Sequence, residues 1–340
     1  MSRHARRSAK LVLLLVVVGQ TVAAQDQAVL NTPQSEVSEQ IEAARQLIAD
    51  GRSREGIAAL QAVCGQFPSV APAWDALASA QEQAGDLTNA QAAHMRALAL
   101  GAESHERCQS AFAFFVRNER FSAGAAAFRL LCGPHPDWIV QRTMYANLLQ
   151  ASGQEQQASA EFREIASFAS GDFAQRSAPD LLHIGAACVE TGRADDGVKV
   201  MRAAASSAPD SSSVWFWLGR AEAESGQVEQ AIAHVRKAID LAPEDASVAL
   251  WFAEFSLEHS DETAVEAVDH LLQLRPDMVA QRVSLIKHLQ GQGEVDELRR
   301  QQQMLAAWGS GNGWRALSTE EKLFLGAACI DTGRPDEALP

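Results

Sequence analysis

Large apolar residues recur along this chain with the spacing of amphipathic helices that come in pairs. In one 34-residue stretch, Trp215 and Leu218 stand three positions apart, so they share one face of a predicted helix. Small residues at Gly219 and Ala231 let two helices approach closely. Between the two helical segments, Gly226 suits the left-handed conformation that ends a helix. The pattern therefore predicts a helical hairpin.

The hairpin pattern recurs with a period of about 34 residues. The units that carry it most clearly are 71–104, 178–211 and 212–245. Looser copies are 37–69, 105–137 and 246–277, and longer copies are 138–177 and 279–318. In unit 105–137 we expect a shortened turn between the two helices. One hairpin cannot bury its own apolar face, so neighbouring hairpins must stack on one another.

The motif Trp215-x-x-Leu218-Gly219, with Ala231, Val235 and the helix-ending Pro243 after it, resembles the tetratricopeptide repeat (TPR) consensus W-x2-L-G…A-x3-F…P. The resemblance implies an all-α fold, an α-solenoid of stacked antiparallel helix pairs that coils into a TPR superhelix. It covers about residues 37–340, as about eight full repeats plus a partial ninth.

A longer period overlies the first one. The ten residues 184–193 return nearly unchanged at 325–334, 141 positions later, and Trp74 aligns with Trp215 at the same offset. The chain therefore has the organisation of a duplicated block. The expected parts are block 1 (37–177, four repeats, the last one long), block 2 (178–318) and an incomplete ninth repeat (319–340).

The N-terminus has the organisation of a secretory signal peptide. Four basic residues precede the apolar run Leu11–Val18, and small residues follow up to Ala24. We expect a signal peptide at 1–24, cleaved after Ala24, and a linker at 25–36. The alternative is an uncleaved membrane anchor, which is disfavoured because a spanning helix needs about 18–20 apolar residues. The mature chain is therefore expected to be periplasmic or secreted, without stable membrane insertion.

Composition and charge narrow the class of partner. Hydrophobic residues make up 47% of the chain but aromatic residues only 6%, which suits closely packed helices. The formal net charge is −14, and it becomes −18 without residues 1–24, which carry four basic residues and no acidic ones. Such an acidic chain is a poor candidate for binding nucleic acid or an anionic membrane surface.

The cysteines and histidines do not form a motif for catalysis or metal binding. The five cysteines are Cys64, Cys108, Cys132, Cys188 and Cys329. We interpret them as small core residues, with a Cys108–Cys132 disulfide inside one repeat as the alternative. The glycine-rich segment 309–313 follows a helical pattern rather than a strand, so we interpret it as a linker loop. We expect no catalytic residue, no metal site, no cofactor and no enzyme activity.

Binding residues are expected on the first helix of each repeat, because the TPR resemblance implies that these helices line a concave groove. The candidates are Asp75, Glu82, Phe216, Trp217, Arg220, Trp251 and Glu254. Phe216, Trp217 and Trp251 would form an exposed aromatic patch, a common type of interaction hot spot. The alternative is that Trp217 and Trp251 pack between neighbouring repeats.

The two long repeats carry aromatic residues beside their inserted loops. Phe168 and Phe173 flank the first loop, and Trp308 and Trp314 flank the second. These residues either contact a partner or cover an enlarged gap between repeats.

Two functions remain open from the sequence. The first is an exported, non-catalytic scaffold that binds a protein or peptide of unknown identity along a concave groove. The alternative is the TPR arm of a larger enzyme or of a polysaccharide-export or secretion component. The abrupt end of the sequence at Pro340 suggests this alternative, because a second helix has just begun there. We therefore expect a fragment or a truncated gene product.

Overall fold

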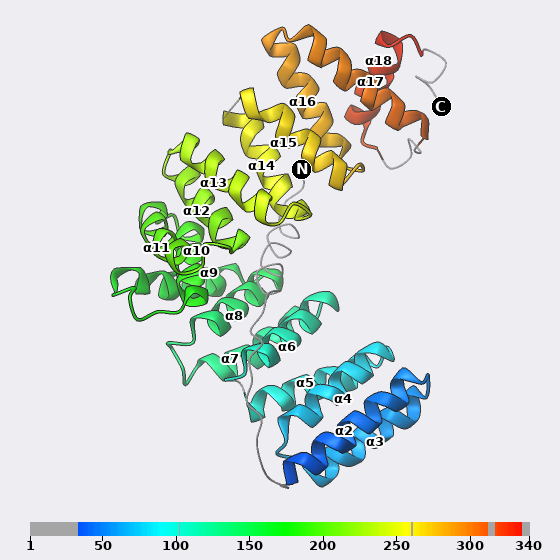
Figure 1. Ribbon diagram of the computed structural model, residues 1–340, viewed down its shortest axis with the longest axis vertical. Coiled ribbons are helices and arrows are strands. Elements are labelled where there is room, and N and C mark those ends of the chain that lie inside the picture. The colour runs from blue at the N-terminus through cyan, green and yellow to red at the C-terminus, as the bar shows by residue number, and fades with distance from the viewer. Residues whose placement is uncertain (1–32, 102, 260, 312–316, 335–340) are drawn as a thin grey trace. The chain divides into compact units, whose positions relative to one another are not determined.

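The computed structural model describes residues 33–101, 103–259, 261–311 and 317–334, which form helices joined by short turns (Figure 1). These residues contain no β-strand. The chain divides into two compact units, residues 1–204 and 205–340, and this division does not coincide with the boundary between the sequence blocks. The all-α fold expected from the sequence is confirmed.

The first unit is a row of helical hairpins, each with a first and a second helix. In chain order they are α2 (Pro33–Ala49) and α3 (Ser53–Gln66), α4 (Ala71–Gln83) and α5 (Leu87–Leu100), α6 (His105–Arg117) and α7 (Phe121–Cys132), α8 (Ile139–Ala151) and α9 (Glu155–Ser167) with the 3-10 turn η2 (Phe168–Ser170), and α10 (Ala178–Glu190) and α11 (Ala194–Ser207). Each second helix from α3 to α9 contacts the first helix of the next hairpin (Figure 1). The hairpins therefore stack as a solenoid.

The second unit continues the same pattern within itself. Its helices are α12 (Ser212–Glu224) and α13 (Val228–Leu241), α14 (Ala246–His259) and α15 (Asp261–Leu274), α16 (Val279–Gln292) and α17 (Val295–Gly311), and α18 (Thr319–Asp331). Ser318 and Glu321 form a capping box at the start of α18, which satisfies two backbone N–H groups. The second half of the predicted ninth repeat, from residue 335, lies outside the described residues.

Glycines close most of the turns inside the hairpins. Gly85 and Gly226 have φ values of 78° and 76°, the left-handed conformation expected from the sequence. In the third hairpin the same position holds Glu119, with φ 54°. The expectation of a shortened turn there is wrong, because residues 118–120 form a turn as long as residues 84–86. The shortening falls in α7, which has 12 residues where α5 has 14.

Small residues on the first helices allow close packing within a hairpin. A Cβ atom added to Gly219 would lie 2.5 Å from Cγ2 of Val235. One added to Gly185 would lie 2.6 Å from Cε of Met201. Both distances are below van der Waals contact. A side chain at Gly219 would also meet the backbone oxygen of Ala231 at 3.0 Å and would force the two helices apart, whereas one at Gly185 would displace the Met201 side chain.

The tryptophans at the start of two first helices have a common hydrogen bond. The indole Nε1–H of Trp74 donates to the carbonyl oxygen of Pro68 at 3.1 Å, and that of Trp215 donates to Pro209 at 2.6 Å. Each proline stands in the turn before the helix that carries the tryptophan. The indole therefore satisfies a carbonyl group that the preceding turn leaves without a helical partner.

Of the N-terminal predictions, only the linker at 25–36 overlaps the residues that the structure describes. The helix α2 begins at Pro33, inside the segment 25–36 that we expected to be a linker. The predicted signal peptide and its cleavage site at Ala24 lie outside the described residues. Among the described helices, none combines the length and the apolar character needed to cross a membrane.

Candidate functional site

Two acidic candidates on α4 form ion pairs with the next hairpin. Asp75 accepts from Nε of Arg107 at 2.9 Å, and Glu82 accepts from Nη2 of Arg117 at 2.9 Å. Burial raises the pKa of Asp75, and the nearby Arg107 guanidinium opposes that rise. Both carboxylates thus hold α6 against α4, so a partner would have to compete with an arginine for either one.

The structure buries two of the three predicted patch residues. Phe216 is 2% exposed and Trp217 is 3% exposed, so neither presents its ring at the surface. The Phe216 ring packs edge-on against Trp217 at 5.9 Å and against Trp251 of the next hairpin at 5.6 Å. The expectation of an exposed patch is therefore wrong for Phe216 and Trp217, because stacking of consecutive first helices covers this face.

The outer part of the same cluster is accessible at Trp251 and His259, whereas Phe255 between them is buried. Trp251 is half-buried and stacks on Phe255 at 4.9 Å, and Phe255 stacks on His259 at 4.5 Å, which makes a ladder of three rings along α14. The Arg220 guanidinium lies 4.4 Å above the Trp217 ring. Glu254 is exposed next to this ladder on α14. We call Arg220, Trp251, Glu254, Phe255 and His259 the first-helix site.

The loop aromatics have separate environments. Phe168 and Phe173 are half-buried, and the Arg176 guanidinium lies 4.7 Å from the centre of the Phe168 ring. Trp308 packs against the core formed by α16, α17 and α18. Trp314 lies outside the described residues. Trp308 therefore has a packing role in this structure, and the role of the other loop aromatics as contacts stays a prediction.

The thiols are poorly suited to chemistry. None of the five cysteines forms a disulfide, including Cys108 and Cys132, and all five are buried. Burial raises the pKa of Cys64 to about 11 and that of Cys132 to about 12, so these thiols stay protonated near neutral pH. Within the described part of the chain, no three His, Cys, Asp or Glu side chains are grouped as a metal ion would require.

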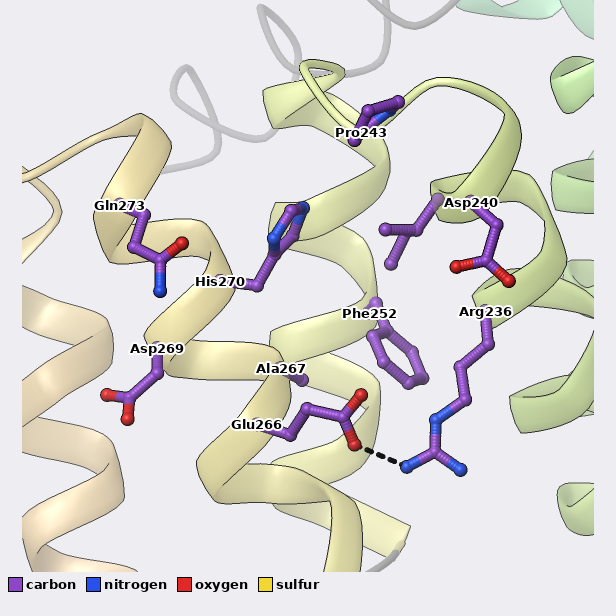
Figure 2. A pocket seen from close by; sticks show the side chains of 10 residues that line it. Arg236, Asp240, Pro243, Phe252, Glu266, Ala267, Asp269, His270 and Gln273 are labelled. Carbon is purple, nitrogen blue, oxygen red and sulfur yellow. Dashed lines mark hydrogen bonds and ion pairs between the residues drawn. The ribbon is translucent and has the colours of Figure 1, made fainter.

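A pocket between second helices was missed by the sequence analysis. It has a volume of about 580 Å³ and lies between α13 and α15, with Phe252 of α14 behind them (Figure 2). Its lining residues are Arg236, Ile239, Asp240, Pro243, Phe252, Glu266, Ala267, Asp269, His270 and Gln273. The residues predicted to bind lie on first helices and beside the inserted loops. The pattern in the sequence that could have predicted the pocket is the set of charged residues on α13 and α15, at positions that face a neighbouring second helix.

The charges of this pocket are partly compensated. Arg236 donates to Glu266 at 2.5 Å across its mouth (Figure 2). Asp269 is paired with Arg300 of α17. Among the described residues, the Asp240 carboxylate has no hydrogen bond or ion pair. The pocket therefore combines an apolar wall with one uncompensated negative charge.

Comparison with known proteins agrees with the hairpin architecture. A family model described as "Tetratricopeptide repeat" matches residues 187–246, from α10 to the start of α14. No curated protein matches the chain. A tetratricopeptide repeat protein from Parabacteroides merdae has a similar structure, with 14% identity and a TM-score of 0.49 over 75% of this chain and 99% of that one.

Two other solved structures resemble the chain. One is a human IFIT1 dimer with PPP-AAAA, with 14% identity and a TM-score of 0.44 over 100% of this chain and 93% of that one. The other is YrrB, described as a TPR protein with an unusual peptide-binding site, with 16% identity and a TM-score of 0.36 over 56% of this chain and 95% of that one. At these identities a likeness concerns the fold alone.

The family match and the internal geometry agree on the repeat type. The matched segment contains Gly192 and Gly226 in left-handed turns, and Gly219 in close contact with the second helix of its hairpin. The same layout of helices and turns recurs in the hairpins of both units. Residues 187–246 of this chain therefore match the tetratricopeptide repeat family, and the hairpins before and after this segment have the same layout.

Proposed function

We propose that this chain is an exported, non-catalytic scaffold that binds a protein or peptide segment at the first-helix site. The observation that carries the proposal is the half-buried Trp251 at the edge of a packed aromatic cluster, with exposed Glu254 beside it. Tryptophan and arginine are enriched among the residues that dominate interface energies. A ring held by packing loses little conformational entropy when a partner docks on it.

The expected mode of binding is docking on a preformed surface. Phe216 is a core residue that packs against Trp251, and Trp217 packs against Phe216, so both position the contact without touching a partner. Arg220 and Glu254 supply one charge of each sign at the edge, where charged groups set orientation more than affinity. The partner is therefore expected to bring an apolar or aromatic side chain to Trp251.

The direct test is a site-specific photo-crosslinker in the native host. A benzoyl-phenylalanine at position 254 should give a discrete crosslinked product that mass spectrometry can identify. The same group at Met304, which is exposed on α17, is the matched control. Equal products at both positions, or none at position 254, would contradict binding at the first-helix site.

A substitution separates contact from packing. Trp251→Ala should abolish the crosslink from position 254 and leave the helical circular dichroism signal unchanged. Phe216→Ala is unsuitable as a contact test, because it should unfold the repeat by removing a buried ring. If Trp251→Ala also removes cooperative unfolding, the residue has a packing role and the contact role is wrong.

Export is a separate part of the proposal and rests on the N-terminal pattern alone. Sequencing the N-terminus of the protein recovered from the cell envelope should show Gln25 as the first residue. A protein that keeps Met1, or that is found only in the cytoplasm, would contradict export and leave the binding site untouched.

A second candidate function is the TPR arm of a larger enzyme or of an export component. The observation that favours it is the apolar face of α18. Leu323 and Ile330 are 69% and 61% exposed there, whereas the corresponding Leu182 and Val189 of α10 are 5% and 3% exposed. Such a face fits further helices packed on α18.

Cysteine labelling can test the arm hypothesis. A Leu323→Cys variant of the protein as the host makes it should resist maleimide if further chain covers α18. Rapid labelling of that variant would contradict the arm and favour the scaffold.

A further inference from the structure

The pocket between α13 and α15 lies on second helices, away from the first-helix site. We propose that it is a second binding site, which takes a lysine or arginine side chain of an extended peptide segment. The inference goes beyond the proposed function, because it places a distinct ligand on a different set of helices.

The charge of the pocket selects the ligand. Three carboxylates line it, against the guanidinium of Arg236 and the imidazole of His270. Glu266 is neutralised by Arg236, and Asp269 by Arg300. Only Asp240 is left among the described residues without a hydrogen bond or an ion pair. A positive group is therefore the complement of this pocket, and a phosphate or carboxylate ligand would be repelled.

The neighbouring cations of α13 are already engaged. Nζ of Lys237 lies 3.6 Å above the Trp215 ring, and His234 pairs with Glu222 at 2.5 Å. Arg236 reaches across to Glu266. No basic side chain of α13 is therefore directed to Asp240, which leaves that carboxylate for a cation from outside the chain.

The rest of the lining suits the stem of a long basic side chain. Ile239 and Pro243 on one side, Ala267 on the α15 side and Phe252 between them supply the apolar part of the lining. Lysine and arginine bury their methylene groups along such surfaces and keep the charged head in water or at a carboxylate. In Figure 2, Asp240 lies on the α13 side of the pocket, and Phe252 lies between Asp240 and the α15 side chains.

The dimensions favour a peptide-borne cation over a free ion. A volume of about 580 Å³ is within the range of sites that hold organic ligands, and it exceeds the need of a single ammonium group. The pocket opens between two helices, and the Gln273 amide at its edge can donate to and accept from a peptide backbone.

The test uses the mature chain and two fluorescent peptides in anisotropy titrations at low salt. One is a capped five-residue peptide with arginine at its centre, threonine on each side and leucine at each end. The other has glutamine in place of arginine. The arginine peptide should bind about fivefold more tightly than the glutamine peptide, as expected for one exposed ion pair.

Matched variants locate the effect. Asp240→Asn should abolish the fivefold preference. Asp210→Asn, which removes the same charge from an exposed turn of the same unit, should retain it. Unchanged helicity and melting of both variants are required for the comparison.

Several outcomes would overturn the proposal. They are equal binding of the two peptides and an equal loss of the preference in Asp210→Asn and Asp240→Asn. Full competition by free N-acetylarginine amide at the peptide's own concentration would show a small-cation site and overturn the peptide part. Each of these results leaves the crosslinking test of the first-helix site unaffected.

Discussion

The first helix of one long repeat, α8, is buried along nearly its whole length, whereas its counterpart α16, 140 positions later, leaves one face exposed. Both helices are contacted by four helices at corresponding places, α6, α7, α9 and α10 for one and α14, α15, α17 and α18 for the other. The difference therefore lies in side chains. Met144 of α8 is 4% exposed, and the corresponding Ser284 of α16 is exposed.

An arginine stands at the same position in the two long repeats, but its hydrogen-bond partners differ. Arg142 is buried and donates to Glu161 at 3.0 and 2.6 Å. The corresponding Arg282 donates to the amide oxygen of Gln301 at 2.8 Å. The Gln301 amide in turn donates to Asp269 and Glu297 at 3.0 and 2.9 Å, and both of these carboxylates pair with Arg300. The arginine is present in both copies, and in the second copy a neutral amide stands between it and the carboxylates.

A third difference concerns the second helices of α4–α5 and α12–α13. His94 of α5 is 2% exposed and packs on Phe114 at 4.6 Å, whereas the corresponding position in α13 is the buried Val235. Burial, together with Arg117, lowers the pKa of His94 to about 4, although Glu82 acts in the opposite direction. The two hairpins therefore have the same helices and turns, but only the hairpin with His94 has a titratable side chain at this position.

The largest expected effect comes from exchanging the residues that distinguish α8 from α16. Met144→Ser should destabilise the first unit by about 3 kcal/mol, because it leaves a cavity and a buried hydroxyl group. Ser284→Met should change stability by no more than about 0.5 kcal/mol, because the position is exposed. Urea unfolding followed by circular dichroism measures both. Equal effects would mean that the two helices are buried to the same extent.

The next effect concerns the arginine pairs. Glu161→Gln should cost about 1–2 kcal/mol, because buried Arg142 loses its carboxylate. Gln301→Glu should cost a similar amount, since it replaces two donated hydrogen bonds with a third carboxylate beside Asp269 and Glu297. Stabilisation by Gln301→Glu would show that Arg282 lacks adequate compensation in the native chain. The midpoints of urea unfolding at two salt concentrations separate these outcomes.

The presence of His94 in one hairpin and Val235 in the other predicts that stability depends on pH. Unfolded His94 titrates near its ordinary pKa of 6.5 and the folded residue near about 4, so the unfolded state binds more protons between these values. Stability is therefore lost as the pH falls through this window, by about 2 kcal/mol near pH 5. His94→Val, which copies Val235, should reduce the slope of stability against pH from 6.5 to 4. An unchanged slope would remove His94 as its cause.

The smallest effect tests the turn that lacks a glycine. Glu119→Gly should stabilise the third hairpin by about 0.5–1 kcal/mol, because glycine adopts a positive φ without strain. Gly85→Ala in the neighbouring hairpin is the control and should destabilise by about 1 kcal/mol. Thermal melting measures both changes. Destabilisation by Glu119→Gly would mean that the Glu119 side chain contributes more than its backbone costs.

The sequence by itself determined the repeat period, the hairpins and the turns that contain a glycine. These depend on local spacing: Trp215 and Leu218 on one helical face, Gly226 at a left-handed turn, Gly219 at a close approach. The contrast between Met144 and Ser284 is also readable once the 140-residue offset is known. Such features follow from backbone geometry within one hairpin, so no distant contact is needed to predict them.

Only the tertiary structure decided which of the candidate residues face solvent. Phe216 is buried because Trp251 of the next hairpin packs on it. Asp75 forms an ion pair because the next hairpin supplies Arg107. The pocket beside Asp240 arises from the spacing of α13 and α15, which no single repeat encodes. Helical periodicity places a residue on a face, but the stacking of neighbouring hairpins determines whether that face is covered.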